Sequence, residues 1–537
     1  MRWSTLGRRV SGFAGAWSRV AGVAGSGVLV VASSMAACGT NSNNGSGSDA
    51  GGDAADDSGE SGVIQMFGSS SGSDGGGSSG SSSGGTVCPT GLQCNVACDG
   101  GGMTTTISGT VYDPALKNPL YGIAVYVPAT PLQPLTRGVL TGADACSCSA
   151  LYKAGATAST TTDVNGHFVL KNAPVGTNVQ LVLQDGKWRH VETLPVVNAC
   201  ADNPQPDKSL ALNGTVAPGS DDSMPDIAVS TGFADELECL LIRVGIPPTE
   251  FVAGNSQSGH VHIFSGGNPA IQGDNGGPEL HPMAGAPESD LSLWNGAAQL
   301  MPYDIVLLSC EGAETYMPEP NALETYLNAG GRAFASHYHY KWFNGASPAD
   351  WGSNLASWTP GSIPSPGPED GVIVQSLNAN DGVFVKGQAM AQWLANVHAL
   401  GVNADPGDLS IYYPKSNAVV TPTNTPSQPW ITLPSDDSGA PTQTMYFSFD
   451  TPVDAVVPAD GGAPNYCGRA VFSDLHVSGD PTTHDTTNLP DGGPPPQGCG
   501  IGDLSPQEKA LEFMLYDLSS CVVADSVAPP NKVPMVN

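Results

Sequence analysis

The sequence predicts a multidomain protein in which an immunoglobulin-like β-sandwich precedes an α/β domain with a flavodoxin-like, doubly wound sheet. Two patterns predict this fold class. Residues 104–216 contain short strands with a period of two, whereas residues 217–525 alternate apolar strands with helices. The length supports it as well, because 537 residues with 40% apolar content can form two or three domains with cores of their own.

The first 37 residues have the layout of a bacterial export signal. Residues 1–19 contain four arginines and no acid, and residues 20–37 form an apolar run of small side chains. The run ends in Met-Ala-Ala followed by Cys38, which resembles the lipobox of bacterial lipoproteins. The resemblance implies that Cys38 is acylated and becomes the mature N-terminus. No other apolar stretch is long enough to span a bilayer. We therefore expect an exported cell-envelope protein, at the outer membrane or cell surface, anchored to the membrane by this lipid alone.

Residues 38–86 consist mainly of Ser, Gly, Asn and Asp, and their few apolar side chains cannot offset the entropy of ordering the chain. We expect a flexible tether between the lipid and the folded part. Loss of the signal changes the net charge from −31 to about −35, because the signal carries four arginines and no acid. Such an acidic surface repels phosphate backbones, which argues against a nucleic-acid partner and fits a solvated, exposed protein.

Twelve cysteines are spread along the chain, and eleven remain for pairing if Cys38 is acylated. Most cysteines of an exported protein form disulfides, and an odd number leaves one thiol free or intermolecular. Disulfides are favoured over zinc because no Cys-x-x-Cys pair recurs at metal-ligand spacing. Residues 87–103 form a Cys-rich segment before the first predicted domain. The spacing leaves the pairing open.

Short alternating runs separated by Pro, Gly and Asn predict strands in the first domain, at residues 107–112, 123–127, 166–170 and 179–183. Three motifs in this region resemble the carboxypeptidase regulatory-like domains. They are SGTVYD from residue 108, TTDVNGHFVL from residue 161 and APVGTNVQLVLQ from residue 173. The resemblance implies a β-sandwich that acts as a spacer or adhesion module without catalysis of its own.

The second domain opens with a change of pattern. Residues 305–308 predict a strand buried on both faces, and a helix follows with Asn321 as its cap and a stop at Gly330. Further strands are predicted at residues 227–230, 260–264, 332–336, 409–413, 444–449 and 469–472. Further helices are predicted at residues 234–244, 388–400 and 506–518, the last with a capping box from Ser505 to Glu508. Strands that alternate with helices predict a parallel sheet, and residues 526–537 form a tail.

Two stretches of this domain resemble the trehalose-utilisation (ThuA-like) family of the class I glutamine amidotransferase-like superfamily. The first runs from Asp-Ile-Val at residue 304 through the helix to Ala-Phe-Ala-Ser-His, which ends at His337. The second is Gly-Arg-Ala-Val-Phe-Ser from residue 468, followed by His476. The resemblance implies that His337 and His476 correspond to the two family histidines, near the carboxyl edge of the sheet. The chain departs from the family by an added His339 and an excursion between Cys467 and Cys499.

Hydrolytic members of the superfamily carry a cysteine on a strained turn from strand to helix, paired with a histidine. The corresponding turn follows Ala335 and contains Ser-His-Tyr, so we do not expect amidotransferase chemistry. Cys310 ends the preceding strand and is a candidate catalytic thiol if a histidine lies near it. The alternative for Cys310 is a disulfide bond or packing against the sheet.

Histidines at the predicted sheet edge are candidate ligands for a divalent metal, namely His337, His339 and His476. His337 and His339 are two residues apart and would share one face of a regular strand. Nearby carboxylates that could supply oxygen ligands or bases are Glu311, Glu314 and Asp474. Two alternatives stay open: His337 and His476 form an acid–base pair, or the histidines are hydrogen-bonded residues packed among aromatic rings.

Side chains beside the histidines are candidate ligand contacts, namely Glu311, Tyr338, Tyr340 and Trp342. The indole rings of Trp342, Trp351 and Trp358 offer flat faces to a sugar, and hydrophobic packing explains them equally well. We expect a lipid-anchored surface protein that binds a ligand or serves as a scaffold, with a carbohydrate as the candidate ligand. The alternative is a metal- or histidine-dependent hydrolase or lyase that acts on saccharides.

Overall fold

The computed structural model describes residues 87–99, 104–266, 279–345, 351–361, 363, 367–403, 405–435, 442–456, 465–476, 499–500, 502–526 and 533–536. The expected export signal, Cys38 and the tether lie outside these residues. The chain divides into two compact units, Met1–Ser79 and Gly80–Asn537, and all described residues belong to the second. Among the described helices, none has the length and apolar character needed to cross a bilayer.

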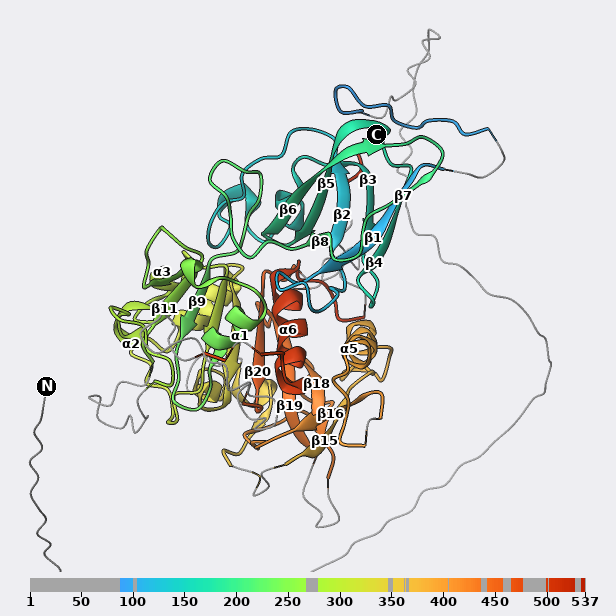
Figure 1. The fold of residues 1–537 in the computed structure, drawn as a ribbon. Helices are drawn as coiled ribbons and strands as arrows, with labels where there is room; N and C mark the ends of the chain where they lie inside the picture. Colours follow the sequence, from blue (N-terminus) through green and yellow to red (C-terminus); the bar gives the residue numbers. More distant parts are fainter. Residues whose placement is uncertain are drawn as a thin grey trace, which may run out of the picture. The chain divides into compact units, whose positions relative to one another are not determined.

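Two four-stranded sheets fill the first part of the described chain (Figure 1). One sheet has the order β3-β2-β5-β6 and contains β2 (Ala124–Pro128), β3 (Ala156–Thr161), β5 (Gly176–Asp185) and β6 (Trp188–Val197). The other joins β1 (Thr106–Tyr112) to β4 (His167–Lys171), β7 (Asp202–Pro204) and β8 (Leu210–Ala211). Apolar side chains of both sheets meet in one core that includes Ile107, Val125, Phe168 and Leu181. All four strands predicted in this region are present.

A ten-stranded sheet forms the second part, with the order β10-β11-β9-β12-β13-β20-β19-β18-β15-β16. Its first six strands pair in parallel and are β9 (Ile227–Ser230), β10 (Phe251–Ala253), β11 (Val261–Phe264), β12 (Ile305–Leu308), β13 (Arg332–Ser336) and β20 (Gly468–Ser473). The remaining strands pair antiparallel and are β15 (Glu369–Ile373), β16 (Asp408–Ile411), β18 (Ser427–Leu433) and β19 (Gln443–Thr451). A separate two-stranded sheet joins β14 (Ser357–Trp358) to β17 (Ala418–Val419). The protein is therefore β-rich and multidomain, with several sheets.

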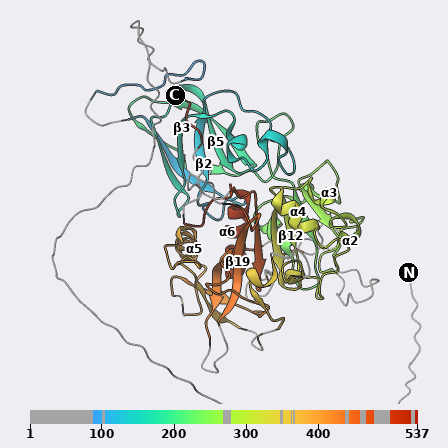
Figure 2. The ribbon, with the colours of Figure 1, turned by 180° about the vertical axis from the view of Figure 1, so that it is seen from behind.

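Helices cover both faces of the parallel strands. The described α-helices are α1 (Leu237–Arg243), α2 (Ser289–Ser292), α3 (Ala297–Leu300), α4 (Ala322–Asn328), α5 (Val385–Asn396) and α6 (Pro506–Ser519). Apolar residues of α1, α5 and α6 pack with Ile305 and Leu307 on one face, and residues of α3 and α4 pack with Val306 and Leu308 on the other. Figure 2 shows α4 close to β12 and α6 close to β19. Because each face is covered, every residue of β12 is buried.

Shorter 3-10 helices occur at η1 (Gly142–Asp144), η2 (Cys148–Tyr152), η3 (Pro248–Glu250), η4 (His337–Trp342) and η5 (Gly352–Asn354). The predicted capping box of α6 is confirmed, because Ser505 accepts from the Glu508 amide and Glu508 accepts from the Ser505 amide. Asn321 occupies the predicted N-cap position of α4, but without the capping hydrogen bond. Asn321 has φ −90° and ψ 1°, outside the extended region of a typical cap residue, and its side chain makes no capping bond.

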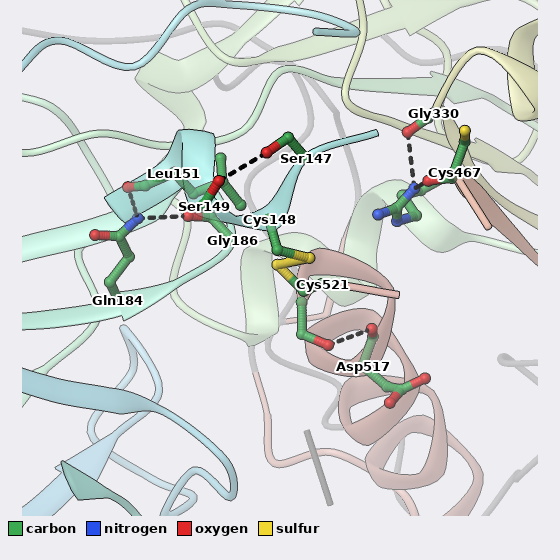
Figure 3. The surroundings of a disulfide bond; sticks show 12 residues. Ser147, Cys148, Ser149, Leu151, Gln184, Gly186, Gly330, Cys467, Asp517 and Cys521 are labelled. Carbon is green, nitrogen blue, oxygen red and sulfur yellow. Dashed lines mark hydrogen bonds between the residues drawn. A yellow bond between two sulfur atoms is a disulfide. The ribbon is translucent and has the colours of Figure 1, made fainter. Parts of the chain in front are cut away.

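Five disulfides connect described cysteines, namely Cys88–Cys94, Cys98–Cys200, Cys146–Cys467, Cys148–Cys521 and Cys239–Cys499. Cys146 and Cys148 flank Ser147, so one short segment is tied twice to the part that contains the ten-stranded sheet. Figure 3 shows the bond from Cys148 to Cys521 after the end of α6, with Cys467 nearby. Cys310 remains free and buried, which leaves one unpaired thiol among the described cysteines.

A buried ion cluster holds α6 against the sheet and predicts a large effect for one substitution. Arg469 is 1% exposed and donates to Asp450, Asp517 and Asp525. Arg469→Met removes the cation that pairs with Asp450 and leaves Lys386 to compensate Asp517 and Asp525, and we expect it to lower the free energy of unfolding by about 3–5 kcal/mol. Urea unfolding followed by circular dichroism measures this loss. The exposed pair of Lys153 and Asp144 supplies the control, since Lys153→Met should cost about 1 kcal/mol or less. Equal losses of unfolding free energy in Arg469→Met and Lys153→Met would contradict a stabilising role of the buried ion cluster.

A carboxyl pair at the contact between β1 and α6 predicts a pH dependence. Burial raises the pKa of Asp113 to about 6, and burial beside Asp113 raises the pKa of Glu512. The folded-state pKa lies above the unfolded value near 4. The protonated pair therefore stabilises the fold fully below pH about 4, and this stabilisation is lost as the pH rises through about 6. The melting temperature should therefore fall more between pH 5 and pH 7 in the wild type than in Glu512→Gln. The exposed Asp144→Asn should keep the wild-type profile, and the same profile in Glu512→Gln would refute the pair.

Candidate functional site

The carboxyl ends of three neighbouring parallel strands bring distant residues together. In register, Leu308 of β12 lies beside Ala335 of β13, and Ser336 of β13 lies beside Ser473 of β20. The chain leaves the sheet just after these positions. Cys310, His337 and His476 each follow one of these strands within three residues. Because parallel strands end at the same edge, these three side chains meet there.

We call Cys310, His337 and His476 the Cys-His-His cluster. The sulfur of Cys310 lies 3.3 Å from Nδ1 of His337, and Nε2 of His476 lies 3.2 Å from the same nitrogen. One ligand atom of each residue lies within 4.8 Å of the others. Cys310 is 0% exposed and His337 is 4% exposed, while His476 is partly buried. The cluster is thus compact and largely removed from water.

His337 has an unusual backbone conformation at the turn after β13. Its φ is +43°, a value that is uncommon for residues other than glycine and that costs about 1–3 kcal/mol. The strand ends at Ser336, and the 3-10 helix η4 begins at His337. The side chain of Ser336 is held in place, because its hydroxyl donates to Oδ2 of Asp235 at 2.5 Å. The turn after β13 therefore carries a strained histidine.

Burial keeps the members of the Cys-His-His cluster uncharged. Burial raises the pKa of the Cys310 thiol to about 12. Burial, together with the nearby His476 and Lys415, lowers the pKa of His337 to about 2. Burial and Lys415 lower the pKa of His476 to about 3. A thiol and two neutral imidazoles therefore face each other at neutral pH, in place of a thiolate–imidazolium pair.

A loop between β16 and β17 closes the cluster on one side. The amide of Lys415 donates to the Asp474 carbonyl at 3.0 Å, and the amides of Asn417 and Ala418 donate to Oδ2 of Asp474 at 2.7 and 3.1 Å. Nδ2 of Asn417 donates to the carbonyl oxygen of His337 at 3.4 Å. Burial raises the pKa of Asp474 to about 8, against the lowering effect of these amide bonds. This loop is therefore joined to both histidine-bearing turns.

His339 lies outside the Cys-His-His cluster. The hydroxyl of Thr315 lies 2.8 Å from its Nδ1, and its Nε2 donates to the carbonyl of Ser309 at 2.9 Å. Both ring nitrogens are engaged, so His339 has none left for a metal. The expectation that His337 and His339 share a strand face is wrong, because β13 ends at Ser336 and a 3-10 helix has three residues per turn.

The aromatic candidates separate into one residue at the site and two in the core. The ring of Tyr338 is partly buried and lies 4.0 Å, centroid to centroid, from that of His337. Trp342 is 1% exposed and packs edge-on against Trp294, and Tyr340 is 2% exposed. The rings of Trp342 and Tyr340 pack in the core and offer no open face to a sugar. We therefore assign them a packing role instead of the expected ligand role.

The acidic candidates also differ in their surroundings. Glu311 is 2% exposed, and its Oε1 lies 4.0 Å from Nε2 of His339. Glu314 is exposed, accepts from the hydroxyl of Tyr340 and lies 3.4 Å from Nζ of Lys341. Neither carboxylate belongs to the groups of described residues whose ligand atoms lie within 4.8 Å of one another. Asp474 is fixed by the amide bonds of the loop.

The Cys-His-His cluster fits a tetrahedral zinc ion. Zinc binds sulfur at about 2.3 Å and imidazole nitrogen at about 2.0–2.1 Å, so neighbouring ligand atoms lie about 3.3–3.6 Å apart. Two of the three separations, 3.3 and 3.2 Å, are close to this spacing, and the third is below 4.8 Å. A second group, Cys239, Cys499 and His281, has similar proximity. Its two sulfurs form a disulfide, so it offers no thiolate.

The loop residues Lys415 and Asn417 were not among the candidates from sequence. They lie in a Pro- and Ser-containing stretch about 80 residues after His337, and no motif surrounds them. The sequence gives no signal for them. In the structure β16 ends at Ile411, inside the run predicted as a strand at residues 409–413, and Tyr413 has φ +48°. The chain turns there toward the Cys-His-His cluster.

The burial of Cys310 predicts that its thiol is unreactive in the folded, metal-free protein. In a full-length Cys38→Ser chain, the five disulfides leave Cys310 as the one remaining thiol. A pKa near 12 lowers its thiolate fraction on the order of 1,000-fold, so native protein should resist Ellman's reagent at pH 7.5. Denaturation should release one thiol per chain, and Cys310→Ala should release none. Rapid labelling of the native chain would show that burial does not control this sulfur.

Comparisons with known proteins do not identify a family. No family model and no curated protein matches the chain. Among solved structures, a chain from a type II cohesin–X-dockerin complex of Acetivibrio cellulolyticus is 18% identical, with 29% of this chain and 79% of that chain covered and a TM-score of 0.14. A 9R-lipoxygenase from Cyanothece is 12% identical, with 29% and 24% covered and a TM-score of 0.11. At these TM-scores the likeness does not identify a shared fold.

Proposed function

We propose that the protein is an exported, lipid-anchored hydrolase whose reaction centre is a zinc ion held by the Cys-His-His cluster. The observation that carries this proposal is the convergence of one sulfur and two imidazole nitrogens within 4.8 Å at the carboxyl edge of the parallel strands. This donor set suits zinc, and three protein ligands leave a fourth position for a reactant. The anchoring part of the proposal is supported by the lipobox-like sequence at Cys38.

The residues of the chain orient and shield such a centre. When bound, zinc acts as a Lewis acid and lowers the pKa of water at its open position to about 7. The side-chain amide of Asn417 donates a hydrogen bond to the carbonyl oxygen of His337, and the hydroxyl of Ser336 donates one to Asp235. The ring of Tyr338 covers one side of the His337 ring. These contacts hold the turn that carries the imidazole, and such supporting contacts help to orient a metal ligand.

We also propose that the ten-stranded sheet derives from a flavodoxin-like, ThuA-like domain and that the first two sheets form a carboxypeptidase regulatory-like sandwich. Six consecutive parallel strands with helices on both faces support the first assignment. The position of His337 and His476 after neighbouring strands supports it further. A saccharide as substrate rests on this resemblance alone.

A second candidate function is binding of a ligand without turnover, in which the same edge of the sheet acts as a recognition surface. The partly buried ring of Tyr338 favours this candidate, because it lies beside His337 and leaves part of its surface open. Turnover distinguishes the two functions. A hydrolase needs the zinc ligands for activity, whereas a binding surface keeps its ligand when the zinc is removed.

Metal content tests the proposal directly. Full-length protein purified from the periplasm without chelators should contain close to one zinc per chain by elemental mass spectrometry. Cys310→Ser, His337→Ala and His476→Ala should each reduce this content at least about 10-fold, because the loss of one of three ligands removes most of the binding free energy. His339→Gln and the exposed His398→Ala should keep their zinc. Folded wild-type protein without metal, or equal loss in His339→Gln, would overturn the proposal.

A further inference from the structure

A cavity of about 240 Å³ lies over the sheet that contains β2, β5 and β6. It is lined by Tyr126 of β2, by Arg189 of β6 and by two segments, residues 132–136 and 150–154. Val125, the neighbour of Tyr126, packs in the sandwich core, so the cavity lies on the other face of this sheet. No residue of the Cys-His-His cluster lines it, and the cavity is therefore separate from the candidate site.

The described residues that line the cavity include three cations and no carboxylate. The cations are Lys153, Lys187 and Arg189. Acidic side chains outnumber basic ones 50 to 19 in the whole chain, so a lining with cations alone differs sharply from the rest of the protein. Lys153 and Lys187 have carboxylate partners outside the lining, Asp144 at 2.6 Å and Asp304 at 2.5 Å. Arg189 forms no ion pair with any described carboxylate.

The guanidinium group of Arg189 is buried among neutral partners. The residue is 3% exposed, its Nε donates to the carbonyl oxygen of Asp221 at 2.8 Å, and its Nη1 donates to that of Gln133 at 3.0 Å. Its Nη2 has no hydrogen-bond acceptor among the described residues. The carboxylate of Asp222 is engaged elsewhere, because its Oδ1 accepts from the Val191 amide at 2.9 Å. A buried charge without a counter-ion is unfavourable, so a bound anion would stabilise this arrangement.

The rest of the lining is largely apolar and aromatic. The ring of Tyr126 packs edge-on against that of Tyr152, with their centroids 6.1 Å apart, and Leu132, Leu135 and Leu151 line the same cavity. Small-molecule sites combine such apolar surface with a few fixed polar groups that orient the ligand. A planar guanidinium group matches the geometry of a carboxylate or a phosphate. The two carbonyl contacts hold the Arg189 guanidinium in place before any ligand binds.

We propose that this cavity binds a small organic oxyanion, a carboxylate or phosphate joined to an apolar group, with Arg189 as its counter-ion. Pockets for drug-sized ligands measure about 300–1,000 Å³, so this smaller cavity suits a molecule with about one substituted ring. The site is independent of the function proposed above, because it lies in the first part of the described chain and requires no metal.

Isothermal titration calorimetry with benzoate and phenyl phosphate tests the proposal on the full-length protein. At least one of these anions should bind 10-fold or more tightly than neutral benzyl alcohol and inorganic phosphate. Arg189→Met should weaken that binding about 10- to 100-fold, the range for a lost hydrogen bond to a charged group. The matched control is Lys171→Met, which removes an exposed lysine of β4 outside the cavity and should bind as the wild type does.

The same titrations after metal removal separate this site from the proposed zinc centre, since zinc also binds oxyanions. Affinity for the organic anion should be equal in the purified and the metal-free protein, whether or not the purified protein contains zinc. Binding that disappears with the metal would assign the anion to the Cys-His-His cluster and overturn the proposal. The absence of binding in the wild type would overturn it as well.

Two further measurements cover the case in which Arg189→Met does not fold, because Arg189 also holds two carbonyl groups. Lys153→Met removes a cation whose side chain is 52% exposed, and it should weaken binding about 2- to 5-fold, the range for an exposed charge pair. In the wild type, a saturating anion should slow hydrogen exchange of amides in residues 132–136 and 150–154 and leave residues 408–419 unchanged. Protection confined to residues 408–419, or unchanged binding in a folded Arg189→Met, would refute the site.

Discussion

The parallel register of β12, β13 and β20 is the constraint on which the site depends. Hydrogen bonding of Leu308 beside Ala335, and of Ser336 beside Ser473, sets the three strand ends level. Residues 310, 337 and 476 therefore lie close together at this edge of the sheet, although up to 166 positions separate them in the chain. A slip of one residue would turn Cys310 or His337 to the opposite face of the sheet. The covered faces prevent such a slip, because every side chain of β12 is buried in one of two cores.

Covalent and ionic links hold the other parts of the chain to this sheet. The disulfides from Cys146 and Cys148 close separations of 321 and 373 residues, and each long loop removes entropy from the unfolded chain. Arg469 extends the connection, because it lies on β20 and pairs with carboxylates on β19, on α6 and after α6. The strand that leads to His476 is therefore fixed at both ends, by the ion cluster at its start and by the amide bonds to Asp474 after its end.

Much of the parallel half was predictable from sequence because its strands are short, continuous and apolar. Residues 227–230, 305–308 and 332–336 match β9, β12 and β13. The antiparallel half was less predictable. The helix expected at residues 388–400 spans Val385–Asn396, and the chain leaves it before His398, which has φ +59°. Several strands were not predicted at all, including β15 and β18, because a Pro in the middle of β18 weakens its strand pattern.

The residues of the candidate site also differ in how far the sequence could predict them. Cys310, His337 and His476 were candidates because they follow predicted strands, and the sheet brings them together. His339 differs because periodicity could not show that the strand ends one residue before His337. The contribution of Asn417 was not visible in the sequence, since it depends on contacts between segments about 80 residues apart. Local patterns predict strands well, whereas the path of a loop depends on tertiary contacts.

Burial decides which chemistry the Cys310 thiol can perform. A cysteine nucleophile needs a lowered pKa, and the pKa of Cys310 is raised to about 12 because burial outweighs the lowering effect of the hydrogen bonds from the Gly312 and Tyr338 backbone. His337 does not help, since burial lowers its own pKa and keeps it neutral. A metal ion changes this balance, because its charge stabilises the thiolate while it accepts the neutral imidazoles in their existing state. The burial that disfavours a nucleophilic role for Cys310 is therefore compatible with a role as ligand.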